Sequence, residues 1–308
     1  MTIRGPAFVD CYDDLADGLT DEMLAAVPGV EVFRSRPSDE DELITRMQGR
    51  RHVLVYMGYM SERVLSACPD LKSIAYLATG LATHGDLDLA KHLGIRFEGI
   101  KGYGDRAVAE HAITLALSGL KRINEMDREV RAGRFRLMAT EEFADKTFGV
   151  IGLGGIGAET ARIADALGAR VIGWTRSGDA GDAPVKMMPL AHVLAQADIL
   201  SLHLALNDQT VRFIDAEMFA RMKRGVLLIN TARAAIIDEP SLLWALKDGT
   251  ISHAGLDVFQ EEPLRVDHPL VSMTNVTLTP HSAWLTRQAT SRLLVAGFHL
   301  LARHVEIG

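Results

Sequence analysis

A glycine-rich turn has the residue types and the spacing that bind a dinucleotide. Its residues are Gly152, Leu153, Gly154, Gly155, Ile156 and Gly157. An apolar stretch at 147–151 precedes the turn, and a helical pattern and a second apolar stretch at 169–174 follow it, which is the context that a dinucleotide fingerprint requires. Gly152 permits the tight turn, Gly154 lets the backbone approach a pyrophosphate, and Gly157 lets the helix pack on the strand. The free N–H groups at the start of the helix would then bind the phosphates.

The residues after the second strand bear on which nicotinamide dinucleotide the turn would bind. In the fingerprint, a carboxylate at this point accepts a hydrogen bond from the adenosine ribose, but this chain has Thr175 there. The guanidinium of Arg176 and the hydroxyls of Thr175 and Ser177 could bind a 2′-phosphate. Arg176 could instead point into solvent, and the nearby Asp179 and Asp182 complicate the choice. The sequence favours NADP(H), with NAD(H) as the alternative.

Three polar residues of complementary chemistry follow apolar stretches in the second half of the chain. They are Arg233, Glu262 and His281. Each has a structural explanation by itself: Arg233 could cap a helix, Glu262 could be a solvated loop acid, and His281 could lie at a domain boundary. In an open parallel sheet, however, ligands bind beyond the carboxyl ends of the strands. The three side chains could therefore converge near a nicotinamide.

The segments that must position these residues alternate between strand and helix. Candidate strands lie at 7–10, 30–33, 52–56, 73–77, 95–98, 147–151, 171–174, 199–203, 226–229, 254–258 and 276–279. Candidate helices lie at 21–26, 39–47, 61–67, 108 to about 131, and 291–304. This alternation predicts an α/β fold of two doubly wound parallel-sheet domains. We expect a discontinuous first domain at 1–100 plus 286–308, on which the closing helix packs, and a dinucleotide-binding domain at 101–285.

Composition and charge limit the class of protein. The 308 residues are 48% hydrophobic and 24% charged, as in soluble globular proteins. The net charge of −7 argues against a nucleic-acid partner, and no apolar run approaches the roughly 20 residues that span a bilayer. Two cysteines and no metal-ligand spacing among the histidines predict neither a disulfide framework nor a metal site. Because the first residues lack the apolar core of a signal peptide, we expect a cytoplasmic protein.

The motifs together resemble the D-isomer-specific 2-hydroxyacid dehydrogenase family, which includes glyoxylate/hydroxypyruvate reductases, D-lactate dehydrogenases and phosphoglycerate dehydrogenases. The glycine turn, the segments after the three strands, Ala-Thr-Gly at 78–80 and Val-Ala-Glu-His at 108–111 carry the resemblance. It implies two Rossmann-like domains with the active site in the cleft between them. It also implies a homodimer paired through the dinucleotide domain, to which the 108–131 segment could contribute.

The resemblance implies roles for the residues that would act on the substrate. His281 resembles the acid/base that protonates the keto oxygen as hydride reaches the carbon, and Glu262 resembles the carboxylate that raises its basicity. Glu262 is preferred to the adjacent Glu261 because it directly precedes the proline. Arg233 resembles the guanidinium that binds the substrate carboxylate and polarises the carbonyl. The backbone of Ala78, Thr79 and Gly80 resembles the loop that holds the other carboxylate oxygen.

The resemblance also implies residues that would contact the cofactor. Asp257 resembles the residue that orients the nicotinamide carboxamide. Asn230, Thr231 and Ala232 would line the cofactor, and His203 could either join them or be purely structural.

The chain departs from the family pattern at a few positions. Ala234 replaces the usual glycine after the arginine, and the 80–86 loop is one residue longer than usual. His84 on this loop could contact substrate or be a solvated turn residue, and Trp284 could line the pocket or pack at a dimer interface. The resulting expectation is an NADPH-dependent reductase of a small 2-keto acid such as glyoxylate or hydroxypyruvate. The alternative is a dinucleotide-sensing protein like the C-terminal-binding-protein corepressors, which share the fold and the three polar residues.

Overall fold

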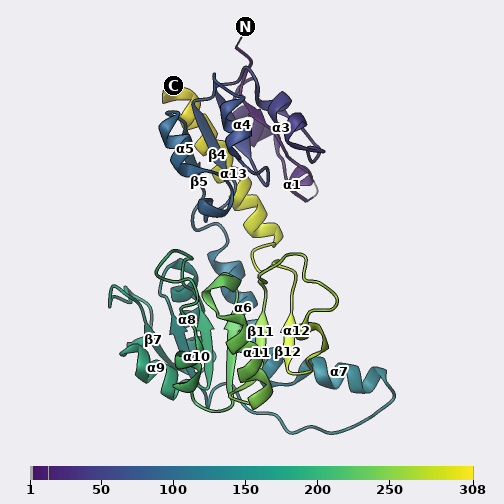
Figure 1. Cartoon of the computed structure of the whole chain (residues 1–308), viewed down its shortest axis with the longest axis vertical. Coiled ribbons are helices and arrows are strands. Elements are labelled where there is room, and N and C mark those ends of the chain that lie inside the picture. The colour runs from purple at the N-terminus through teal and green to yellow at the C-terminus, as the bar shows by residue number, and fades with distance from the viewer. Residues whose placement is uncertain (1–2, 13, 308) are drawn as a thin grey trace. The chain divides into compact units, whose positions relative to one another are not determined.

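The computed structural model describes residues 3–12 and 14–307, and the chain divides into two compact units (Figure 1). Unit 1 comprises Met1–Gly104 and Leu285–Gly308, and unit 2 comprises Asp105–Trp284. The boundaries expected from the sequence, after residues 100 and 285, lie close to these. In the described part of the chain, no helix is long and apolar enough to cross a membrane.

Unit 1 is built on a five-stranded parallel sheet with the strand order β2-β1-β3-β4-β5. The strands are β1 (Ala7–Phe8), β2 (Glu31–Val32), β3 (His52–Val55), β4 (Ser73–Tyr76) and β5 (Arg96–Gly99). The helices before the last are α1 (Asp14–Asp17), α2 (Asp21–Ala25), α3 (Glu40–Met47), α4 (Glu62–Ser66), the 3-10 turn η1 (Leu81–Thr83) and α5 (Leu87–His92). Because successive strand residues face opposite sides, Val53 and Val55 enter one core while Leu54 lies against the closing helix.

The closing helix packs on unit 1, as the sequence predicts. Helix α13 (Arg287–Ile307) contacts β3 and β4 and is longer than the predicted 291–304. Gly297 lies so close to β3 and β4 that a Cβ there would collide with Leu77. Phe298 contacts Phe8 of β1, with the ring centroids 6.2 Å apart. The last segment of the chain therefore completes the core of the first unit.

Unit 2 is built on a seven-stranded parallel sheet with the strand order β12-β11-β10-β9-β6-β7-β8. The strands are β6 (Thr147–Ile151), β7 (Arg170–Trp174), β8 (Lys186–Met187), β9 (Ile199–Leu202), β10 (Val226–Asn230), β11 (Ile251–Leu256) and β12 (Val276–Leu278). The order reverses between β9 and β6, which is the switch point of a dinucleotide-binding fold. The two sheets confirm the predicted α/β fold of two parallel-sheet domains.

Helices cover both faces of this second sheet. They are α6 (Asp105–Leu120), α7 (Ile123–Arg131), α8 (Gly155–Ala166), α9 (Leu190–Gln196), α10 (Ala216–Ala220), the 3-10 turn η2 (Ala234–Ile236), α11 (Glu239–Asp248) and α12 (Pro269–Ser272). Leu227 and Ile229 of β10 join the core under α6 and α8, whereas Leu228 joins the core under α9, α10 and α11. Apolar runs such as 226–229 are typical of strands that are buried on both faces.

The single long helix predicted at 108–131 is wrong, because the structure has two helices there. Helix α6 ends at Leu120, and α7 begins at Ile123 after Arg122 adopts the left-handed conformation with φ of 51°. A left-handed residue cannot continue a right-handed helix, so the chain changes direction at this point. Figure 1 shows α7 projecting from the rest of unit 2. The short edge strand β8 was not predicted at all.

Candidate active site

The strand order of unit 2 brings the ends of the predicted site segments to one edge of the sheet. Neighbouring parallel strands lie about 4.8 Å apart, and each of these residues follows the carboxyl end of its strand. In the order of the sheet, these are His281 after β12, Asp257 and Glu262 after β11, Thr231, Ala232 and Arg233 after β10, His203 after β9, the glycine turn after β6, and Thr175, Arg176 and Ser177 after β7. The candidate acid/base group and the glycine turn therefore belong to one continuous edge.

His281 and Glu262 form the hydrogen-bonded pair expected from the sequence. The Nδ1 atom of His281 lies 2.7 Å from Oε2 of Glu262. The other carboxylate oxygen, Oε1, accepts a hydrogen bond of 3.0 Å from the backbone N–H of Phe259, which fixes the carboxyl plane. The side chains of His281 and Glu262 are 40% and 37% exposed. The pair is thus oriented but accessible, with Nε2 of the imidazole left for another partner.

The turn that carries His281 is held by the buried carboxylate of Asp257. His281 has φ of 52°, a left-handed conformation that costs a non-glycine residue about 1 kcal/mol or more. Oδ1 of Asp257 accepts hydrogen bonds from the Ser282 N–H (3.0 Å) and the Thr279 hydroxyl (2.6 Å), and Oδ2 accepts one from the Ala283 N–H (2.9 Å). These contacts were not foreseen from the sequence, and the contact of Asp257 with a nicotinamide carboxamide stays a prediction.

Arg233 lies half-buried between β10 and η2. The Asn230 side chain shapes this segment, because its Oδ1 accepts from the Ala232 N–H (3.0 Å) and its Nδ2 donates to the Arg233 carbonyl (3.1 Å). The Arg233 guanidinium donates one hydrogen bond of 2.7 Å to the Ala232 carbonyl. No ion-pair partner for it lies among residues 3–12 and 14–307. Its remaining N–H groups are therefore available for an anion such as a carboxylate.

The glycine turn has the geometry that its sequence predicts. Gly152 has φ of 93°, and a Cβ there would lie 2.6 Å from the His203 carbonyl oxygen. A Cβ on Gly157 would collide with the Gly152 carbonyl, and one on Gly155 would collide with the carboxylate of Asp105. Close packing against backbone atoms therefore requires glycine at positions 152 and 157, whereas at Gly155 the neighbour is a flexible side chain.

Gly154 supplies the test of whether a dinucleotide fits this turn. It is the N-cap of α8, whose first turn contains Gly155, Ile156 and Gly157. A Cβ on Gly154 would meet nothing within 4 Å, so this side of the turn is open to a ligand. The open side coincides with the N–H groups and partial positive charge at the start of α8, which fits a pyrophosphate.

The side chain of His203 is held by a contact within its own strand end, and its contact with a cofactor stays a prediction. Its Nε2 lies 2.8 Å from the Ser201 hydroxyl, and its Nδ1 is buried without a hydrogen-bond partner in the described part of the chain. Burial lowers the pKa of His203 from 6.5 to about 4, so the ring is neutral at pH 7. The backbone of His203 also shapes the glycine turn, because its carbonyl lies close to Gly152. The hydroxyl of Thr231 is likewise buried without a partner among these residues.

The segment after β7 leaves Arg176 exposed and pairs its acidic neighbours elsewhere. The Arg176 guanidinium donates to Oε1 of Gln209, a neutral group. Asp182 forms an ion pair of 2.9 Å with Arg162 of α8. The Asp179 carboxylate accepts from the Gly181 N–H at 2.8 Å within its own turn. The two acids that complicated the choice of cofactor therefore have partners other than Arg176.

In unit 1, the predicted substrate loop follows β4. Thr79 is anchored by its hydroxyl, which donates to the Ile100 carbonyl at 2.9 Å, and Ala78 is anchored by the Ile100 N–H, which donates to its carbonyl at 3.0 Å. Within the described ranges, the N–H groups of Thr79 and Gly80 form no hydrogen bond. Two adjacent N–H groups on an anchored backbone can bind a carboxylate oxygen.

The 80–86 loop is joined to the loop after β3 through contacts of His84, Tyr76 and Met60 that the sequence did not predict. His84 stacks on Tyr76 with ring centroids 4.7 Å apart, and its Nδ1 lies 3.2 Å from the Tyr76 hydroxyl. That hydroxyl is also 3.2 Å from the Gly58 carbonyl, and Met60 donates to the His84 carbonyl at 2.8 Å. His84 is thus half-buried and packed on Tyr76.

Asp10 fixes the other side of this loop pair. Its fully buried carboxylate accepts hydrogen bonds of 2.7, 2.8 and 2.8 Å from the backbone N–H groups of Tyr56, Met57 and Gly58. Burial raises the pKa of Asp10, and these hydrogen bonds act in the opposite direction. The sequence signal for Asp10 was present, since it is an acid that directly follows an apolar strand.

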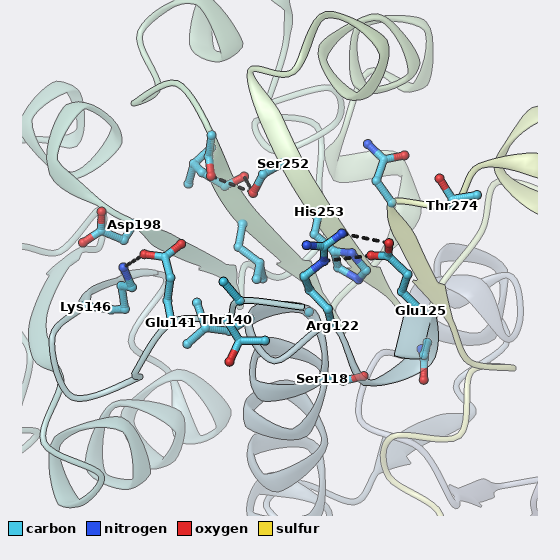
Figure 2. Close-up of a pocket in the computed structure, with 18 of the residues that line it drawn as sticks. Ser118, Arg122, Glu125, Thr140, Glu141, Lys146, Asp198, Ser252, His253 and Thr274 are labelled. Atoms are coloured by element: carbon cyan, nitrogen blue, oxygen red, sulfur yellow. Dashed lines mark hydrogen bonds and ion pairs between the residues drawn. The ribbon is translucent and has the colours of Figure 1, made fainter. Parts of the chain in front are cut away.

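A separate cavity of about 790 Å³ lies at the opposite, amino end of the unit 2 strands (Figure 2). Lys146, Asp198, Ser252 and Thr274, at the starts of β6, β9, β11 and β12, contribute to its wall. Figure 2 shows its charged groups paired with one another, among them Arg122 with Glu125 at 2.8 Å and Lys146 with Glu141. Burial lowers the pKa of His253, in this wall, to about 4. The cavity shares no residue with the predicted site.

Comparisons with known proteins agree with this geometry. A family model described as D-isomer specific 2-hydroxyacid dehydrogenase, NAD binding domain, matches residues 113–283. A glyoxylate reductase of Aeropyrum pernix is 34% identical over 288 residues, covering 89% of this chain and 83% of its own, and a hydroxypyruvate reductase of Blautia hydrogenotrophica is 32% identical over 275 residues, covering 85% and 84%. The solved structure of an acyclic imino acid reductase, Bsp5, in complex with NADPH and D-Arg, has a TM-score of 0.83 and 28% identity over 94% of this chain and 93% of its own.

Proposed function

Because this chain belongs to the D-isomer-specific 2-hydroxyacid dehydrogenase family of NAD(P)-dependent enzymes, we propose that it reduces a small 2-keto acid to the D-2-hydroxy acid with NADPH. Glyoxylate and hydroxypyruvate are the proposed substrates, since similar proteins carry these activities in their names. The observation that carries the proposal is the 2.7 Å contact of His281 with Glu262, on the same sheet edge as Arg233 and the glycine turn.

His281 is the proposed acid. Its Nδ1 is engaged by Glu262, so Nε2 is the nitrogen that can give a proton to the keto oxygen. The bound cofactor supplies the hydride that reaches the carbonyl carbon. When His281 gives its proton to the substrate, the positive charge of the ring beside Glu262 is removed. In the reverse direction, His281 accepts the proton of the substrate hydroxyl. Glu262 therefore orients the ring so that Nε2 is the nitrogen that exchanges a proton with the substrate.

Arg233 and the loop after β4 are the proposed binding groups for the substrate carboxylate. The guanidinium has N–H groups without partners in the described part of the chain, and a planar fork suits a carboxylate. The N–H groups of Thr79 and Gly80 would bind the other oxygen. Arg233 would also stabilise the negative charge that develops on the keto oxygen.

The proposed preference for NADPH rests on the segment after β7. An exposed guanidinium at Arg176, with hydroxyls at Thr175 and Ser177 and no carboxylate at the ribose position, suits a 2′-phosphate. NADH would lose this contact but would meet no repulsion. Thr231, Ala232 and Asp257 would line the nicotinamide half of the cofactor.

The proposed assembly is a homodimer that uses α7 and the segment after it. No residue of α7 is buried, although the helix carries Ile123 and Val130, and Phe135 and Leu137 are 88% and 90% exposed. Apolar side chains this exposed are typical of a protein interface. Light scattering should give a dimer mass for the wild type and a monomer mass for Phe135→Ser with Leu137→Ser.

The reaction is tested by the loss of NADPH absorbance when the purified protein is mixed with glyoxylate, hydroxypyruvate, pyruvate or bulkier 2-keto acids, each also with NADH. Turnover that requires a 2-keto acid supports the proposal, and the ratio of kcat/KM values ranks the substrates. Cofactor binding without turnover on any acid would contradict it and favour a dinucleotide sensor.

A further inference from the structure

We propose that His111, acting through Thr279 and Asp257, is a positioning residue for the acid/base group His281. The proposal rests on the proposed function of His281. It assigns to α6, which lies outside the three segments that supply the proposed catalytic residues, a part in holding the imidazole in place. The proposal starts from a chain of contacts that leads from His111 to the turn around His281.

The hydrogen-bond donors in this chain have a defined direction. The Thr279 hydroxyl lies 2.6 Å from Oδ1 of Asp257 and 3.0 Å from Nε2 of His111. A hydroxyl has one proton, and a carboxylate can only accept, so the Thr279 proton goes to Asp257. His111 must then donate its Nε2–H to the Thr279 oxygen. The Nε2 atom is also 3.6 Å from Oδ1 of Asp257, and this short distance further favours a donor on that nitrogen.

The end of the chain holds the backbone on both sides of His281. The Asp257 carboxylate accepts from Thr279, two residues before His281, and from the N–H groups of Ser282 and Ala283, which directly follow it. The backbone of His281 is left-handed, and the His281 N–H donates to the Thr279 carbonyl at 3.0 Å. A left-handed non-glycine residue persists only where its surroundings fix it, so these contacts determine where the imidazole points.

The burial of the three residues separates positioning from catalysis. The side chain of Asp257 is 1% exposed and that of His111 is 24% exposed, whereas that of His281 is 40% exposed. The imidazole of His281 makes its own hydrogen bond, from Nδ1 to the carboxylate of Glu262, a residue outside this chain of contacts. His111, Thr279 and Asp257 therefore act on the direction of the His281 side chain and not on its charge partner.

Two pairs of variants test the proposal. Thr279→Val removes the hydroxyl at nearly constant volume, and Thr279→Ser keeps it. His111→Leu removes the donor, and His111→Gln keeps an N–H at a similar distance from the backbone. A displacement of an acid/base group by about 1 Å can lower turnover by as much as 100-fold, so we expect kcat to fall by about 10- to 100-fold in the Val and Leu variants. The Ser and Gln variants should regain most of that loss, and the KM for the keto acid and the Kd for NADPH should change less than about twofold in all four.

Several results would overturn the proposal. One is a kcat near that of the wild type in Thr279→Val and His111→Leu. Another is a loss of kcat in Thr279→Ser and His111→Gln as large as in the Val and Leu variants. A third is a loss of NADPH affinity that parallels the loss of kcat. If one residue's variants do not fold, the other pair still decides between these outcomes.

A measurement without turnover separates this proposal from the proposed function. If the wild type reduces no 2-keto acid, the proposed function fails, but the His281 imidazole can still be followed by NMR, with its signals assigned from His281→Ala. Thr279→Val should then shift the His281 ring signals while Thr279→Ser leaves them in place. Unchanged signals in both variants would refute the positioning role.

Discussion

Replacement of Glu262 by Gln tests the acid/base pair with little change in shape. The amide oxygen can still accept from the Phe259 N–H, but the amide NH₂ now faces Nδ1 of His281, where a carboxylate oxygen lay 2.7 Å away. The imidazole must present a bare Nδ1 to this donor, and the imidazolium form loses its counter-charge. The imidazolium ring, which gives the proton from Nε2 to the substrate, is therefore less stable in Glu262→Gln than in the wild type.

The magnitude follows from the exposure of the pair. A hydrogen bond to a charged group contributes roughly 1.5–3 kcal/mol, but an ion pair in water contributes only about 0.2–1 kcal/mol. Because both side chains are nearly 40% exposed, we take a value between these, about 1–2 kcal/mol. This corresponds to a roughly 5- to 30-fold loss in kcat.

The assay is steady-state reduction of the best 2-keto acid, with NADPH affinity measured separately by fluorescence. Glu261→Gln is the matched control, since Glu261 is exposed, adjacent and of the same charge. We expect it to keep kcat within about twofold of the wild type. A loss below threefold in Glu262→Gln, or an equal loss in the two variants, would refute the assignment of Glu262.

Three further predictions concern the cofactor site and stability. Arg176→Ala should raise the Kd of NADPH about tenfold or more and leave that of NADH nearly unchanged, because a charged hydrogen bond to phosphate is worth about 1.5–3 kcal/mol; equal changes in titration calorimetry would contradict the 2′-phosphate contact. Gly157→Ala should lower Tm because its Cβ would collide with the Gly152 carbonyl, whereas Gly154→Ala should keep Tm and weaken NADPH, so a thermal scan with and without NADPH distinguishes the two. Burial lowers the pKa of His253 to about 4, so between pH 6.5 and 4 this histidine is protonated in the unfolded chain but neutral in the folded one. The free energy of unfolding should therefore fall as the pH drops from 6.5 to 4. His253→Gln should reduce that loss, by at most roughly 3 kcal/mol, in denaturant titrations at pH 4.5 and 7; an unchanged pH dependence would show that His253 does not contribute.

The sequence was sufficient to predict the parts of the molecule whose residues fit only one local structure. The strand–turn–helix around Gly152 was predicted with its bounds for β6, because glycines at that spacing leave the backbone few alternatives. The convergence of Arg233, Glu262 and His281 was predicted because parallel strands bring their carboxyl ends together, and the pairing of His281 with Glu262 was implied by the family resemblance. The closing helix was placed on the first unit. These features depend on local conformation and on sheet topology, both of which leave a pattern in the sequence.

Features that depend on contacts between distant segments were not predictable. The break at Arg122 is a left-handed turn without glycine, so no residue marks it. The hydrogen bonds from the segment at 279–283 to both carboxylate oxygens of Asp257 were not predicted, and its contact with the cofactor stays a prediction. His84 was expected either to contact substrate or to be a solvated turn residue, and its stacking on a tyrosine of the preceding strand was not predicted. For Asp257 and His84 the partners lie in other segments of the fold, and a single sequence does not specify which segments meet.

The joined loops of unit 1 have a consequence for how substrate preference can change. The loop after β3 and the 80–86 loop share a bridge between Met60 and Gly85, and both depend on Tyr76 for a polar contact. Substitutions in one loop should therefore show strong epistasis with those in the other. If only the 80–86 segment were taken from a relative, Met60 and Tyr76 would contact loop residues that differ from their present partners, Gly85 and His84. Exchange of the whole 56–86 segment, which carries Met60, Tyr76 and Gly85 together, keeps the two loops matched and is the smallest unit that laboratory recombination should move between relatives.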